Sequence, residues 1–267
     1  MIENTIIDAA FEAGPHLRSL ITELPESPGS DDMGASLRLF KIRAASTDGR
    51  RSSANILIQR RYAWRGYETS PAPFEQQGLD RMTLIASDGD TTIGTMSVGF
   101  DGPGGLLVED LFPAEVNALR AAGCRVCEFT KLAVDVALSS KRVLASLFHV
   151  AYIFAYRVMK FDRLLIEINP RHVKYYERIL GFKAIGPQRI NQRVNAPAVL
   201  MCLDFAHTEA QIGKFGGRPQ LSATERSLYP YSFSVEEEAG IVARMTGATR
   251  SRLSGEPLRH SLLPRVS

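Results

Sequence analysis

A carboxylate and an ammonium group interrupt an apolar run at residues 126–134, VCEFTKLAV, which predicts a β-strand. Glu128 lies inside this run, where its carboxylate could accept a proton from a substrate as a general base. In a regular strand Glu128 and Thr130 share one face, whereas Lys131 points to the other. Glu128 could instead form a structural ion pair with Lys131 or with an arginine, and the sequence leaves both interpretations open.

Basic side chains recur around a short helix predicted over residues 172–180. The spacing i, i+3, i+7 places Arg171, Lys174 and Arg178 along one stripe. Such a stripe is ordinarily a solvated face. Together with Lys141 and Arg142 it would also suit the docking of an acidic protein partner.

The composition indicates a globular protein without nucleic-acid or metal partners. The 267 residues are 45% hydrophobic and carry a net charge of +3, well below the charge typical of nucleic-acid binders. The three cysteines lack the additional Cys or His ligands that a zinc site needs, so no metal is expected. The N-terminus has no basic secretion signal, which predicts a cytoplasmic protein. The most apolar stretch, residues 143–156, is too short to span a membrane.

The middle of the chain predicts alternating strands and helices. An Asp-Gly turn joins two short β-rich runs, and Pro113 suits the first position of a helix. The predicted helices cover residues 52–65, 113–123, 142–160 and 172–180, and the predicted strands cover 82–87, 92–100, 126–134, 163–168, 182–185 and 198–205. The strand, helix, strand order implies a mixed sheet with a parallel pair at its centre.

Changes in composition divide the chain into three parts. Residues 22–35 are rich in Pro, Gly, Ser and acids, which predicts a flexible link after a short N-terminal helix. Beyond Ala206 the chain is polar, and a capping box from Ser234 to Glu237 predicts one helix ending near Met245. The expected parts are an N-terminal segment and linker (1–35), a main domain (36–206) and a C-terminal extension with one helix (207–267).

Four sequence stretches between about Arg61 and Phe205 carry a family resemblance. They read TTIGTMSVGFDGPGGLLVEDLFPAEVNALRAAG, CEFTKLAVD, IEINPRHVKYYERILGF and NAPAVLMCLDF. This segment resembles the GNAT-like family of long-chain N-acyl amino acid synthases, of the N-acyltyrosine synthase type, and more distantly the acyl-homoserine-lactone synthases. The resemblance implies an α/β (α+β) fold with a GNAT-type mixed, splayed central sheet flanked by helices. It also implies an N-acyltransferase that moves a medium- or long-chain acyl group to the amine of a free amino acid.

The resemblance assigns roles to particular residues. Glu128 would take the amine proton, and Lys131 falls on an arginine position of the lactone synthases. GNAT relatives carry a β-bulge in this strand, so one is expected near Phe129. Asn169 and Tyr176 match an Asn and a Tyr seven residues apart, which makes Tyr176 a proton donor to the leaving thiolate, with Tyr175 as its rival. The further candidates for substrate binding are Thr130, Leu132, Asn169, Phe148 and Tyr152, and those for the acceptor carboxylate are Arg61, Lys131 and Arg193.

The segment that would bind the donor lacks a feature of general GNAT enzymes. Those enzymes hold the coenzyme A pyrophosphate with a glycine-rich loop, whereas this chain reads DVALSSKRVLAS, without glycine between Val136 and Ser146. The predicted donor is therefore an acyl-phosphopantetheine thioester on an acyl carrier protein, with no permanently bound cofactor. The predicted docking residues are Lys141, Arg142, Arg171, Lys174 and Arg178.

Two other functions remain open at this point. An acyl-homoserine-lactone synthase would use S-adenosylmethionine, and for the N-terminal aromatic set of that family the chain offers only Trp64. A catalytically silent GNAT-like binding module is the other alternative.

Overall fold

A computed structural model describes residues 5–12, 37–64, 81–135 and 141–254 of the chain. The helices are α2 (Asp48–Trp64), α3 (Pro113–Ala121), α4 (Lys141–Tyr152), α5 (Val173–Leu180), α6 (Phe205–Phe215) and α7 (Val235–Ser254). The strands are β1 (Thr5–Glu12), β2 (Leu37–Ala44), β3 (Arg81–Asp88), β4 (Thr91–Phe100), β5 (Val126–Val134), β6 (Arg163–Ile168), β7 (Lys183–Ala184), β8 (Arg189–Asn191) and β9 (Ala196–Asp204). A short 3-10 helix, η2 (Leu107–Asp110), precedes α3, and a π-helical segment, η3 (Ile153–Val158), follows α4.

The strands form one mixed sheet. Their order is β1-β2-β3-β4-β5-β6-β9-β7, and β8 pairs with β9. Only β5 and β6 run parallel among the paired strands described. This places the predicted parallel pair at the centre of the sheet and confirms the GNAT-like architecture.

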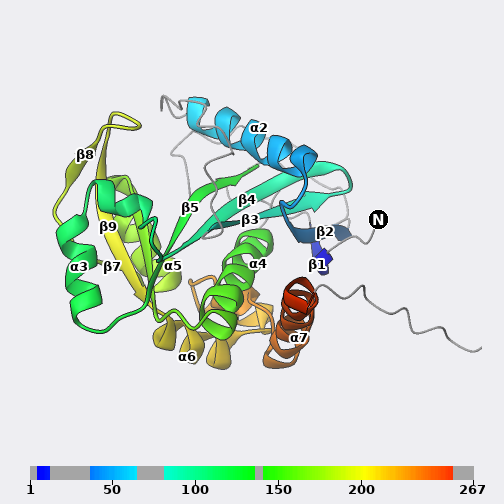
Figure 1. The fold of residues 1–267 in the computed structure, drawn as a ribbon. Helices are drawn as coiled ribbons and strands as arrows, with labels where there is room; N and C mark the ends of the chain where they lie inside the picture. The colour runs from blue at the N-terminus through cyan, green and yellow to red at the C-terminus, as the bar shows by residue number, and fades with distance from the viewer. Residues whose placement is uncertain (1–4, 13–36, 65–80, 136–140, 255–267) are drawn as a thin grey trace, which may run out of the picture.

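Helices cover both faces of this sheet (Figure 1). One face packs against α4, α6 and α7, which share the largest apolar core with the strands. On the other face Leu57 and Ile58 of α2 pack on Ala133 of β5. Val108 of η2 and Val116 of α3 also pack there, on the apolar side chains of β5, β6 and β9. The strands therefore lie between two layers, which we call the α2 face and the α4 face.

The structure corrects the prediction at both ends of the chain. Residues 5–12 form strand β1, antiparallel to β2, so the predicted N-terminal helix is wrong. The predicted linker at residues 22–35 lies outside the described residues. The extension contains two helices rather than one, because α6 was not predicted. The capping box is confirmed, since Glu237 N–H donates to Ser234 Oγ at 3.2 Å and Ser234 N–H donates to Glu237 at 2.8 Å.

Glycines 181 and 213 permit a paired stability test. Gly181 ends α5 with φ +82°, and a Cβ atom there would lie 2.5 Å from His207 Nε2. Gly213 lies in α6, where an added Cβ would meet nothing within 4 Å. Gly181→Ala is expected to lower the free energy of unfolding by about 1–2 kcal/mol, and Gly213→Ala to raise it by about 0.5–1 kcal/mol. Denaturant unfolding of both variants measures this, and equal effects would contradict it.

Candidate functional site

The two parallel strands separate at the centre of the sheet. Pairing between β5 and β6 ends where Glu128 lies opposite Leu165, although both strands continue beyond that point. The separated segments leave backbone groups that are not used by this pair of strands. A splayed parallel pair of this kind offers N–H groups to a substrate carbonyl.

A β-bulge follows directly in β5. Thr130 lies opposite Ser97 and Ala133 opposite Thr95, so β5 has one residue more than β4 over this stretch. Lys131 occupies the bulge with φ +54°, a left-handed conformation that is uncommon for lysine. The bulge prediction is confirmed, two residues after Phe129. The alternation of β5 side chains between the two faces of the sheet shifts by one residue at this point. Leu132 packs on the α4 face and Ala133 packs on α2.

Glu128 forms a buried ion pair on the α2 face. Its side chain is fully buried, and Oε1 accepts a hydrogen bond from Arg81 Nη2 at 2.6 Å. Its other oxygen accepts from the backbone N–H of Val108 at 3.0 Å. Arg81 also donates to Thr130 Oγ1 at 3.2 Å. The sequence left open whether Glu128 pairs with an arginine, and the structure identifies that arginine as Arg81, from β3.

Neighbouring elements provide the space and the donor for this pair. A Cβ atom at Gly99 would lie 2.8 Å from the Glu128 carboxylate, so the glycine makes room for it. Arg120 holds the segment that carries Val108, because it forms ion pairs with Asp101 and Glu109. The hydrogen bond from Arg120 lowers the pKa of Glu109. The amide of Val108 is thereby fixed toward Glu128 before any ligand arrives.

A second carboxylate, Glu167 of β6, lies on the same face and was not singled out from the sequence. Asn191 Nδ2 donates to its Oε1, and Arg193 Nη2 approaches its Oε2 at 3.3 Å. Arg193 also pairs with Asp110 at 3.0 Å. Burial raises the pKa of Glu167, and the nearby charge of Glu128 adds to the rise.

Two other cations lie close to the α2 face. Burial lowers the pKa of Lys131, and the positive charge of Arg81 lowers it further, so Lys131 is near the Glu128–Arg81 pair. Arg61 of α2 forms an ion pair with Asp135 at 2.9 Å. The structure thus brings Glu128, Thr130 and Lys131 together, whereas Arg61 is held at the end of β5.

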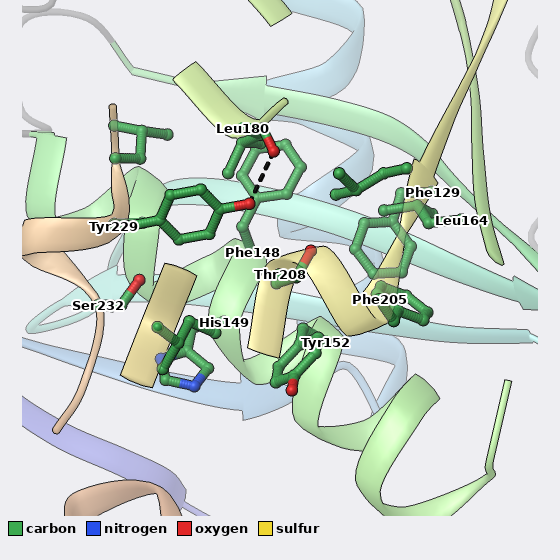
Figure 2. Close-up of a pocket in the computed structure, with 14 residues that line it drawn as sticks. Phe129, Phe148, His149, Tyr152, Leu164, Leu180, Phe205, Thr208, Tyr229 and Ser232 are labelled. Atoms are coloured by element: carbon green, nitrogen blue, oxygen red, sulfur yellow. Dashed lines mark hydrogen bonds between the residues drawn. The ribbon is translucent and has the colours of Figure 1, made fainter. Parts of the chain in front are cut away.

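An apolar pocket lies on the opposite, α4 face. Phe148 and Tyr152, both predicted to bind substrate, line it together with Phe129 and Leu164 from the separating strands. Its cavity volume is about 20 Å³, so the side chains that line it nearly fill it. Figure 2 shows Tyr229 and Thr208 on the side formed by the C-terminal segment.

The predicted proton donors lie on α5. Tyr175 and Tyr176 are both half-buried and pack against the main core, with their rings edge to face at 5.3 Å. Burial raises the pKa of Tyr175 to about 12, so its hydroxyl is a weaker acid than that of an ordinary tyrosine. The Asn169 side chain accepts the backbone N–H of Arg171 at 3.2 Å and so caps the turn before α5.

The predicted docking residues are distributed over two helices. Lys174 and Arg178 are exposed on α5, and Arg171 is exposed in the 3-10 turn (Pro170–His172) before it. Lys141 is exposed at the start of α4, while Arg142 is half-buried. The glycine-free segment at residues 136–140 lies outside the described residues.

In the part of the chain that the structure describes, no group of three His, Cys, Asp or Glu side chains could hold a metal ion. No helix in that part is long and apolar enough to cross a membrane.

The family of the chain follows from its match to known proteins. The family model of the N-acyl amino acid synthase FeeM matches residues 53–204, which is more than half of the chain. The chain belongs to the FeeM family of N-acyl amino acid synthases. It is therefore an acyltransferase that acts with an acyl thioester donor and an amino acid acceptor.

The solved structure of FeeM shows the same fold. FeeM itself, an N-acyl amino acid synthase from uncultured soil microbes, is 28% identical with a TM-score of 0.59, over 63% of this chain and 93% of its own. The AHL synthase LasI (12% identity, TM-score 0.46) covers 63% of this chain and 91% of its own. A putative N-acetyltransferase from Lactobacillus plantarum is 16% identical with a TM-score of 0.45, over 62% of this chain and 98% of its own. None of the curated proteins matches the chain.

The site geometry suits the chemistry of this family. Amide formation from a thioester needs a base for the amine, stabilisation of the oxyanion and a proton for the thiolate. The separated strands carry carboxylates on the α2 face and an apolar pocket on the α4 face.

Proposed function

We propose that this synthase transfers a medium- or long-chain acyl group from an acyl carrier protein to a free amino acid. The observation that carries the proposal is the gap that opens beyond Glu128, with carboxylates on one face and an apolar pocket on the other. The thioester carbonyl lies in this gap, against the backbone of the β5 bulge at Lys131. The acyl chain extends toward the α4 face.

The acceptor binds on the α2 face. Glu167 and Arg193 lie side by side there with opposite charges, which matches the ammonium and carboxylate groups of a free amino acid. Glu128 takes the proton from the attacking amine, and Arg81 keeps its carboxylate in place. After the tetrahedral intermediate collapses, the thiolate leaves and Tyr176 supplies its proton.

A protein-borne donor is supported by charge. The exposed basic stripe of Arg171, Lys174 and Arg178 suits an acidic carrier protein. The absence of glycine between Val136 and Ser146 disfavours a cradle for the coenzyme A pyrophosphate. A phosphopantetheine arm needs no such cradle, because the carrier protein supplies the binding contacts.

A donor comparison tests the proposal directly. The purified protein is incubated with one amino acid panel and three donors, acyl carrier protein, acyl-coenzyme A and acyl-pantetheine, and products are identified by mass spectrometry. An N-acyl amino acid is expected, with the highest kcat/KM for the carrier-protein donor. A higher kcat/KM for acyl-coenzyme A would overturn the donor assignment.

Charge reversal then locates the docking surface. Replacing Arg171, Lys174 and Arg178 by Glu is expected to raise KM for the acyl carrier protein about tenfold, because exposed charges act mainly on encounter. The effect fades as salt rises, since exposed charges are screened within about 10 Å at 0.1 M ionic strength. Acyl-pantetheine kinetics stay unchanged. Reversing Lys214, Arg218 and Arg244, which are equally exposed on the C-terminal segment, is the matched control.

A further inference from the structure

The hairpin formed by β8 and β9 carries two residues that contact Glu167. Asn191 is the last residue of β8, and Arg193 lies in the turn that leads to β9. Both side chains reach the Glu167 carboxylate on β6, one at each of its oxygens. The hairpin therefore forms one wall of the proposed acceptor site.

Small residues on β9 allow this contact. Asn191 pairs with Ala196 of β9, and Glu167 pairs with Leu200. Ala198 lies between these two positions and shares their face of the sheet, because side chains alternate along a strand. Its methyl group is buried, and so short a side chain leaves room for Asn191 to reach Glu167.

Both polar groups of the Asn191 side chain have a partner, and the partners fix its orientation. The residue is only 6% exposed, and the backbone N–H of Arg193 donates to its Oδ1 at 2.7 Å. A backbone N–H can only donate and an ionised carboxylate can only accept, so the amide oxygen faces Arg193 and the amide nitrogen faces Glu167. One side chain thus shapes the turn at Arg193 and donates a hydrogen bond to Glu167.

A second set of contacts fixes the hairpin to the rest of the fold. Arg189 of β8 donates two hydrogen bonds to Glu115 of α3, at 2.8 and 2.9 Å, and a third to the backbone carbonyl of Leu111. Its guanidinium also lies over the Phe112 ring, 4.7 Å from the centroid. The amide of Asn191 is therefore held in place before an amino acid binds.

Burial gives Glu167 a need for a hydrogen-bond donor. Its side chain is 13% exposed, and burial raises its pKa, which favours the neutral form. The hydrogen bond from Asn191 opposes that rise, because it stabilises the charged form. The amide engages Oε1, so the oxygen left for an ammonium group is Oε2, on the side of the more exposed Arg193.

We infer that Asn191 is a positioning residue of the acceptor site, which orients the Glu167 carboxylate toward the ammonium group of the amino acid and stabilises its negative charge. The inference rests on the proposed function and adds a residue that touches neither the substrate nor the reacting atoms. Because Asn191 acts on the acceptor through Glu167, it changes the affinity for the amino acid. Proton transfer to Glu128 does not depend on it.

A direct titration of Glu167 tests the inference without turnover. The full-length protein, isotopically labelled at its glutamate carboxyl carbons, is titrated by NMR, and the Glu167 signal is assigned by its absence from Glu167→Gln. In Asn191→Ala the midpoint should move to higher pH, because the carboxylate loses a donor. Asn191→Asp keeps an oxygen for the N–H of Arg193 but brings a second negative charge, so the midpoint should move further. An unchanged midpoint in both variants would overturn the inference.

Kinetics test the same assignment through the acceptor. Asn191→Ala is expected to raise KM for the amino acid about tenfold and to change kcat by less than about threefold, as expected for the loss of one hydrogen bond to a charged group. In the Glu167→Gln background the same substitution should change KM by less than about twofold, because the carboxylate through which it acts is gone. A tenfold rise in that background would also overturn the inference.

A matched control separates positioning from destabilisation. Thr208 of α6 is buried, and its hydroxyl donates to the backbone carbonyl of Asp204 at 3.3 Å. Thr208→Ala should lower the free energy of unfolding without moving the Glu167 midpoint. Asn191→Asp has the shape of the wild-type residue and keeps the test decisive if Asn191→Ala does not fold. A midpoint that moves as expected in a protein that forms no amide would overturn only the proposed function.

Discussion

Replacing Glu128 by Gln is expected to lower kcat by about 100-fold or more, the magnitude typical of the loss of a general base. The two donors bond different carboxylate oxygens, so the single oxygen of the amide can accept from Arg81 or from the N–H of Val108. The variant should still fold, with a lower free energy of unfolding than the wild type. KM for the amino acid should change little, because Glu128 acts on the proton rather than on the bound zwitterion. Steady-state kinetics and circular dichroism measure both properties.

The ion pair with Arg81 offers a control that distinguishes catalysis from structure. If Glu128 served only to neutralise Arg81, then Arg81→Gln should lower kcat as much as Glu128→Gln does. The double variant should then have a higher kcat than either single variant. We expect Arg81→Gln alone to lose less than about tenfold in kcat, and the double variant to remain as slow as Glu128→Gln. Equal losses in the two single variants would contradict the assignment of Glu128 as the base.

The central sheet could be predicted because its signals are local. β3 and β4 flank an Asp-Gly turn, and β5 and β6 are aliphatic runs bounded by Gly123 and by Asn169-Pro170. The strand at residues 5–12 was missed because TIIDAAFE has no clear period, and its pairing with β2 decides its conformation. Asp204 caps α6 by accepting the N–H of Ala206, a signal that the preceding strand obscured.

The site could be predicted only where a single strand carries it. Glu128, Thr130 and Lys131 follow from one stretch of sequence, and the bulge that brings them to one face was expected from the resemblance. Arg81 lies 47 residues away on another strand, so no local pattern links it to Glu128. Glu167 could have been found, because it interrupts the aliphatic run RLLIEI as Glu128 interrupts β5.

Glu167→Gln is expected to raise KM for the amino acid by about 10-fold to 100-fold while kcat changes by less than about threefold. A carboxylate that binds the acceptor ammonium contributes a charge-assisted hydrogen bond, worth about 1.5–3 kcal/mol, to binding before the chemical step. The split between KM and kcat separates this residue from Glu128. The matched control is Glu115→Gln, because Glu115 is equally buried and pairs with Arg189 at 2.8 Å away from β6.

The pH dependence of acceptor binding tests the same residue independently. Because burial raises the pKa of Glu167, its carboxyl becomes neutral at a higher pH than an ordinary glutamic acid. The neutral form cannot balance the acceptor ammonium, so KM for the amino acid should rise as the pH falls through this raised pKa. In Glu167→Gln that acidic limb should disappear, whereas the rise of kcat with pH, which reflects loss of the amine proton, should remain. An acidic limb that persists in the variant would assign the ammonium contact to another carboxylate on the α2 face, with Glu128 and Asp110 as the groups to replace next.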